Sequence, residues 1–133
     1  IIKKIKKISI ILFVTVFSLL VISCRKDDDT NDGPTNAYPR KVKITYVVTS
    51  PQSTSLQLIS YDNETGGVSN VTNPTLPFSK SITRTVNQYD TASMGFGGLP
   101  DTNVKLEIFV DDKQVETQTF TNVGTGALVH LFP

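Results

Sequence analysis

Alternation of apolar and polar residues is the feature that most constrains this chain. In VKLEIFV, residues 104–110, apolar residues stand at every second position and Lys105 and Glu107 lie between them. Successive side chains of a β-strand point to opposite faces, so this period predicts strands with one buried face. Four apolar sets are expected to point inward: Val42, Ile44, Tyr46 and Val48; Phe78, Ile82 and Val86; Ala92, Met94 and Phe96; and Val104, Leu106, Ile108 and Val110.

Turn residues separate the alternating segments. DNETGG at 62–67 and DDKQ at 111–114 are turns by composition, and GGLPDTN at 97–103 is a break. Pro74 and Pro77 cannot both lie in a central strand, and residues 68–72 are predicted to form a short edge strand. The segment SLQLISY is predicted to place Leu56 and Leu58 on one face, with Ile59 and Tyr61 flanking them.

The pattern as a whole indicates an all-β fold. After the first two dozen residues there is no helical period, and about eight short strands follow one another. We therefore expect residues 38–133 to form a small antiparallel β-sandwich of about seven to eight strands, which is a sufficient length for one core. The single cysteine rules out an intramolecular disulfide.

Charge is distributed unevenly along the chain. The formal net charge is +1, but four of the thirteen basic residues lie among residues 3–7. After Ser23 there are nine basic and twelve acidic residues, and 9 − 12 gives −3. Nucleic-acid binding requires a basic patch or stripe, so a nucleic-acid partner is not expected.

The first 23 residues have the organisation of a signal peptide. Four lysines precede an apolar run from Ile8 to Ile22, which is short for a transmembrane helix, and Ser23-Cys24 follows. This ending resembles a bacterial lipoprotein signal, with Val21, Ile22 and Ser23 as recognition positions. The resemblance implies cleavage before Cys24 and lipid attachment to its thiol. The alternatives are an uncleaved anchor and a nucleophilic cysteine, which would need a nearby base.

Residues 24–37 are predicted to form a flexible acidic tether, because they contain almost no apolar residue. A calcium-binding EF-hand frame that begins at Asp27 fails, because Asp32 takes the glycine position and Tyr38 the glutamate position. No metal or other cofactor is therefore expected. The cluster Lys26, Asp27, Asp28 and Asp29 resembles the acidic export signal of Bacteroidota surface lipoproteins. The alternative is a merely soluble tether.

Three motifs lie within residues 42–120: Thr45, Tyr46, Val48 and Thr49 in the first strand, Leu76 to Lys80 in LPFSK, and Ile108, Val110, Asp111 and Lys113 in the last hairpin. Together they resemble the extracytoplasmic domain of the MmpS family of small mycobacterial membrane proteins. The resemblance implies an immunoglobulin-like sandwich. It also implies an accessory role beside large exporters of lipidic molecules, of the MmpL/RND type.

Several isolated residues and short motifs are candidates for sites of chemistry. His130 is expected to be an outward surface residue, and Asp111 and Asp112 a solvated turn. Gly95 to Pro100 joins two strands, and a phosphate loop would need a helix after it. Asp90-Thr91-Ala92 resembles the Bacteroidota O-glycosylation sequon, with Thr91 as the possible acceptor. Three aromatic residues are either exposed contact residues or core: Tyr61, Tyr89 and Phe109.

The sequence thus favours a non-catalytic, lipid-anchored protein of the cell envelope that serves as a binding or accessory module. Its expected partners are the membrane, through the anchor, and a protein or glycan. The expected location is the outer membrane, exposed at the cell surface, with the periplasmic face as the alternative. The alternative function is that of a periplasmic accessory subunit of an MmpL/RND-type lipid exporter.

Overall fold

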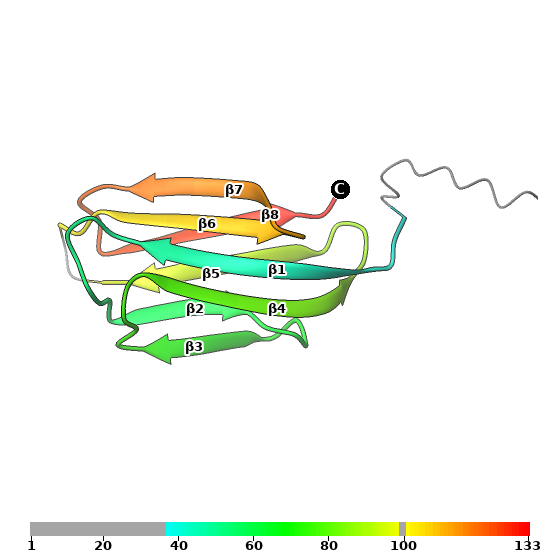
Figure 1. The fold of residues 1–133 in the computed structure, drawn as a ribbon, viewed down its shortest axis with the longest axis horizontal. Helices are drawn as coiled ribbons and strands as arrows, with labels where there is room; N and C mark the ends of the chain where they lie inside the picture. Colours follow the sequence, from blue (N-terminus) through cyan, green and yellow to red (C-terminus); the bar gives the residue numbers. More distant parts are fainter. Residues whose placement is uncertain (1–36, 99–100) are drawn as a thin grey trace, which may run out of the picture. The chain divides into compact units, whose positions relative to one another are not determined.

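Two four-stranded antiparallel sheets make up the fold. The computed structural model describes residues 37–98 and 101–133, and all its regular elements are strands (Figure 1). Within this part of the chain, no helix is long and apolar enough to cross a membrane. The strands are β1 (Arg40–Thr49), β2 (Leu58–Asp62), β3 (Val68–Thr72), β4 (Phe78–Val86), β5 (Thr91–Gly97), β6 (Val104–Val110), β7 (Lys113–Phe120) and β8 (Thr125–Leu131).

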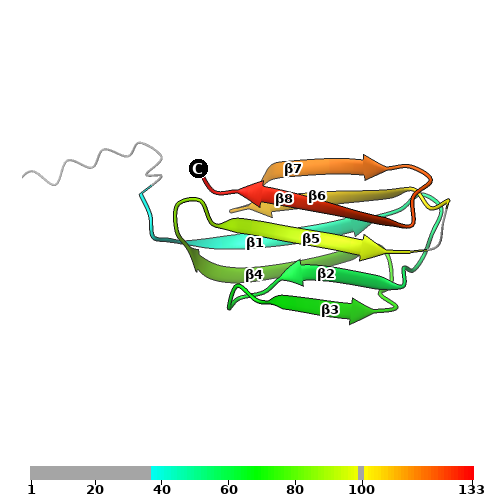
Figure 2. The same ribbon diagram turned by 180° about the vertical axis from the view of Figure 1, so that it is seen from behind.

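The strand order is β4-β1-β6-β7 in one sheet and β3-β2-β5-β8 in the other. Only β2–β3 and β6–β7 are hairpins within a sheet, and the other connections pass from one sheet to the other (Figures 1 and 2). The predicted sandwich is confirmed, as is the edge position of β3. The immunoglobulin-like character that the resemblance implies stays a prediction.

The core lies between the inner faces of the two sheets. The four inward positions predicted in β1 and the four predicted in β6 are all buried, as are the three predicted in β5. Phe132, which directly follows β8, is also fully buried. Each fully buried aliphatic or aromatic side chain contributes about 1.5–3 kcal/mol of stabilisation, so this face dominates the stability of the fold.

Among the described residues, every member of the buried cluster lies between Val42 and Phe132, inside the compact unit Asn36–Pro133. A unit with its own hydrophobic core is a domain that can fold alone. The sandwich is therefore expected to fold without residues 1–35.

The predicted face of the second strand is wrong. β2 begins only at Leu58, and Ile59 and Tyr61 are the residues that point into the core, whereas Leu58 is half-buried. Leu56 is buried, but it lies in an irregular segment, where its N–H donates to the carbonyl oxygen of Pro74 at 3.2 Å. Because Leu56 precedes the strand, the alternation does not run through it.

The β6–β7 turn falls where DDKQ predicted it. Asp111 and Asp112 both have positive φ, 49° and 67°, and the β6–β7 register shifts between Ile108 and Phe109, where Val115 is the extra residue on β7. The carboxylate of Asp111 accepts a hydrogen bond from the Lys43 N–H at 3.0 Å, and the Lys43 Nζ lies 2.5 Å from Asp112. Arg40 also pairs with Asp111 at 3.6 Å. The turn is thus tied to the start of β1.

Candidate functional site

A polar cleft of about 380 Å³ lies where the β2–β3 turn, the end of β4 and the β4–β5 turn meet. We refer to it as the polar cleft. Small-ligand sites usually have volumes of about 300–1,000 Å³ and a few convergent polar groups. The residues that line it are Asp62, Glu64, Thr65, Gly66, Arg84, Thr85, Asn87, Asp90 and Thr91.

Hydrogen bonds to the backbone hold several charged groups of the cleft in place. The Arg84 guanidinium, through Nη2, donates to the carbonyl oxygen of Thr91. Asp62 accepts from the Ser93 N–H at 2.8 Å, and Asp90 accepts from the Asn87 N–H at 2.7 Å. The lining groups are therefore positioned by the fold before any ligand arrives, which lowers the entropy cost of binding.

The β2–β3 turn fixes the second wall of the cleft. The side-chain oxygen of Asn63 accepts from the Thr65 N–H at 3.1 Å and from the Thr65 hydroxyl at 2.7 Å, an arrangement typical of an Asx turn. Gly66 follows with φ of 80°, a conformation that other residues rarely adopt. The turn thereby brings Glu64 and Thr65 to the rim.

The charge of the lining is mixed. Three carboxylates, those of Asp62, Glu64 and Asp90, line the cleft together with one guanidinium, that of Arg84. Tyr46 lies in the core, close enough to Asp62 and Arg84 to be affected by their charges, and its ring centroid is 5.5 Å from that of Tyr61. Burial raises the pKa of Tyr46 well above its ordinary value, and the charge of Asp62 adds to the shift. The phenol therefore stays neutral across the physiological range.

Arg84 is one of the cleft residues that the sequence analysis did not predict as part of a site. It follows Ile82 and precedes Val86 at the inward period of β4, and both of those neighbours are buried. A charged residue at an inward position of a strand needs a local partner, because burial of an unpaired charge is costly. That break in the alternation was the available signal for a polar site at this end of the sandwich.

Thr91, the predicted O-glycosylation acceptor, is exposed on the rim of the polar cleft as the first residue of β5. Its carbonyl oxygen, rather than its hydroxyl, accepts the hydrogen bond from Arg84. The hydroxyl takes no part in that hydrogen bond, and glycosylation at Thr91 stays a prediction. The predicted lipid acceptor Cys24 and the predicted export signal, Lys26, Asp27, Asp28 and Asp29, lie outside the described residues.

The expectation that His130 is an outward surface residue is wrong. It follows Leu128 on the inward period of β8, and its side chain is only 14% exposed. Its Nδ1 lies 3.3 Å from the Glu116 carboxylate, and its ring meets that of Phe132 edge-on at 4.9 Å. At the end of the strand, the inward position faces β7, and a polar ring that pairs with Glu116 fits there.

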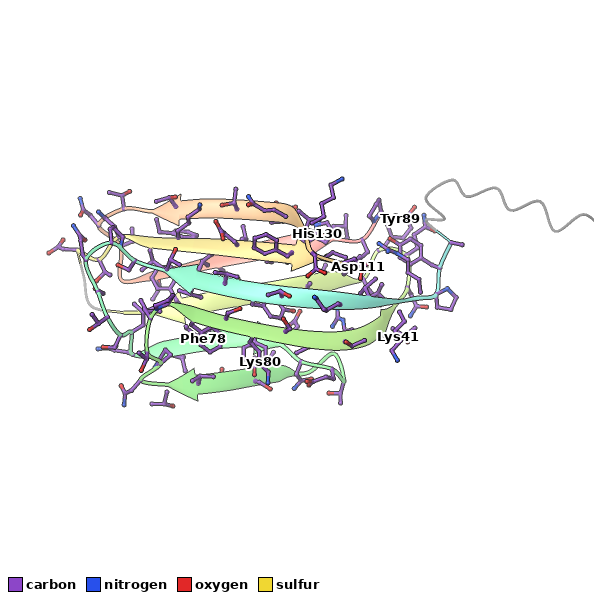
Figure 3. The ribbon with its side chains drawn as sticks, in the orientation of Figure 1. Lys41, Phe78, Lys80, Tyr89, Asp111 and His130 are labelled. Atoms are coloured by element: carbon purple, nitrogen blue, oxygen red, sulfur yellow. The ribbon has the colours of Figure 1, made fainter. Side chains whose placement is uncertain are left out.

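The aromatic candidates divide between core and surface. Tyr61 is core, Phe109 is half-buried on the outer face of β6, and Tyr89 is 69% exposed with φ of 68°. Tyr89 and His130 lie near the same end of the sandwich as the β6–β7 turn (Figure 3). There the Arg40 guanidinium also lies 5.5 Å from the ring centroid of Tyr38. Tyr89 is thus the exposed contact candidate among the three.

Within the described ranges, no group of three or more His, Cys, Asp or Glu side chains is arranged to hold a metal ion. The glycine-rich segment begins inside β5, to which Gly95 and Gly97 belong. The pair Asp111 and Asp112 forms an exposed turn, as expected, and its carboxylates are ion-paired with Arg40 and Lys43.

In comparisons with known proteins, no protein-family model and no curated protein matches this chain. The resemblance of its motifs to the MmpS family therefore stays a prediction from sequence.

Proposed function

We propose that the protein is a non-catalytic, lipid-anchored module of the cell envelope, and that it binds a hydroxyl-rich ligand such as a glycan in the polar cleft. The anchoring part of the proposal rests on the order of basic segment, apolar run and Ser23-Cys24 in the leader. The sandwich would then be held off the membrane by the acidic segment 24–37.

The observation that carries the binding role is the set of positioned polar groups in the cleft. Sugar hydroxyls both donate and accept hydrogen bonds, so they need acceptors and donors side by side. The carboxylates of Asp62 and Asp90 supply acceptors to the cleft, and Arg84 supplies donors. Hydrogen bonds to charged groups are roughly twice as strong as those between neutral groups, which favours a cleft of this composition.

Glu64→Gln tests the binding role, because Glu64 lines the cleft on the exposed turn and its replacement leaves the core intact. Binding of the purified domain to immobilised cell-envelope glycans is expected to weaken by roughly tenfold, the loss of one charge-assisted hydrogen bond. Glu107→Gln is the matched control, because Glu107 lies on β6 outside the cleft. Equal binding by both variants, or no glycan retained by the wild-type domain, would refute the role of the cleft.

The proposed location is the outer face of the outer membrane, directed by Lys26 and Asp27 to Asp29. Replacement of the three aspartates by alanine is expected to leave the protein anchored but protected when intact cells are treated with a protease. The wild-type protein should be digested under the same conditions. Equal protection of both proteins would show that the acidic cluster is only a tether.

A further inference from the structure

The edge strands of the two sheets are protected very differently. In the first sheet, β4 carries Lys80 and Arg84 at inward-period positions, and β7 pairs with β6 across a bulge and begins at Lys113. Inward charges and bulges are devices that stop an exposed edge from pairing with another strand. In the second sheet, the edge strands β3 (VSNVT) and β8 (TGALVHL) contain no Asp, Glu, Lys, Arg or Pro.

One side of β8 has no hydrogen-bonded strand neighbour within the described residues, since β5 is its only partner in the sheet. At one end of the β5–β8 ladder the Phe132 N–H donates to the carbonyl oxygen of Asp90. At the other end the Gly98 N–H donates to the carbonyl oxygen of Gly124. In an antiparallel ladder such hydrogen-bonded pairs alternate with non-hydrogen-bonded ones. The register therefore directs the backbone groups of Ala127, Val129 and Leu131 away from β5, toward the free edge.

The same residues carry exposed apolar side chains. Val129 is 53% exposed and Leu131 is 54% exposed, and Ala127 lies between Thr125 and Val129 on the same outer face. A strand added at this edge would thus satisfy free backbone groups and cover apolar surface in one step. β3 is shorter, and its exposed positions include the polar residues Asn70 and Thr72.

We propose that β8 is a homotypic interaction edge, at which two copies of this chain pair antiparallel, β8 to β8, about a two-fold axis near Val129. Two-fold pairing places a strand opposite itself, and β8 has no Asp, Glu, Lys or Arg that would meet a like charge. The two β3-β2-β5-β8 sheets would then form one continuous sheet of eight strands. Alanine, valine and leucine from both copies would form an apolar ridge along its outer face.

The expected dimer is weak in solution. Two short strands paired edge to edge bury less than the roughly 1,000 Å² that a stable interface needs. The pairing would therefore be weaker than micromolar for free domains. Anchoring both copies in one membrane would raise their effective concentration and favour the dimer.

Sedimentation equilibrium of the domain, residues 36–133, tests the proposal over protein concentrations from about 10 µM to about 1 mM. We expect the wild-type domain to dimerise within this range. Val129→Lys should weaken dimerisation by at least roughly tenfold, because it places two lysines near the axis. Ala127→Pro should do the same, because it removes an N–H directed to the free edge without removing a bond to β5.

Val68→Lys is the matched control, because Val68 is 63% exposed on β3, the opposite edge of the same sheet. It should dimerise as the wild type does, and thermal unfolding should show that all variants stay folded. A wild-type domain that remains monomeric at the highest concentration would overturn the proposal. Dimerisation that Val68→Lys abolishes and Val129→Lys spares would assign the contact to β3 and would also overturn it.

Discussion

Gly126 is the position at which the packing of the sandwich can be tested most sharply. It lies on the inward period of β8, where a Cβ atom would be 2.6 Å from Phe96 Cε1 and 2.8 Å from two atoms of the Phe120 ring. The two rings contact each other edge-on, with centroids 5.5 Å apart. An alanine at this position therefore cannot be accommodated unless at least one ring moves.

Two opposing contributions set the change in the free energy of unfolding that Gly126→Ala should cause. Overpacking a core costs about 1–3 kcal/mol, while Gly→Ala at a compatible backbone position stabilises by about 0.4–1 kcal/mol through the unfolded chain. Because Phe120 is only partly buried and can shift, we expect Gly126→Ala to lower the free energy of unfolding by about 1–2 kcal/mol. Gly97→Ala is the matched control, because its Cβ would meet only the Leu58 Cβ, at 3.8 Å.

Urea unfolding of the domain, followed by circular dichroism, measures both changes. The midpoint should fall for Gly126→Ala and stay equal or rise slightly for Gly97→Ala, with unchanged slopes. A loss of about 1 kcal/mol corresponds to roughly 4–8 °C in Tm for a domain of this size. If Gly126→Ala were as stable as Gly97→Ala, the close approach of β8 to the two phenylalanine rings would be wrong.

Two further substitutions test the core. Ile44→Ala, at a fully buried position of β1, should lower the free energy of unfolding in urea by about 2–5 kcal/mol, and a loss below about 1 kcal/mol would contradict that burial. Tyr46→Phe should change it by less than about 1 kcal/mol near neutral pH, because the Tyr46 hydroxyl has no protein hydrogen-bond partner. Burial raises the pKa of Tyr46 in the folded state, so this residue's contribution to stability is present below the unfolded pKa of about 10 and is lost as pH rises above it. Tyr46→Phe should therefore lose less stability than the wild type between about pH 9 and pH 12, and equal losses in urea titrations would argue against that burial.

Much of the fold could be predicted because several strands bury one whole face. In β1 and β6, which are central strands, every second residue is apolar, and the inward face followed directly from the sequence. The face of β2 could not be read in this way, because Leu56 reaches the core from an irregular segment. The pairing of β1 with both β4 and β6 depends on packing between segments that are distant along the chain, which alternation alone does not encode.

The candidate site was less predictable than the fold. Asp62, Arg84 and Asp90 come from three separate segments, and only the pairing of β2 with β5 and the β4–β5 turn bring them together. Thr91 was predicted from its neighbours, but its place on the rim of the polar cleft depends on the same turn. His130 was misplaced because a single polar residue in a strand gives no sign of a partner such as Glu116 on another strand.

The mass of the mature protein's amino terminus tests the central claim most directly. Purification from native membranes and mass spectrometry of the amino-terminal peptide would show whether the chain begins at Cys24 and carries lipid. The proposal predicts cleavage between Ser23 and Cys24, a diacylglyceryl group on the thiol and an acylated amino terminus. An intact leader with an unmodified Cys24 thiol would contradict it.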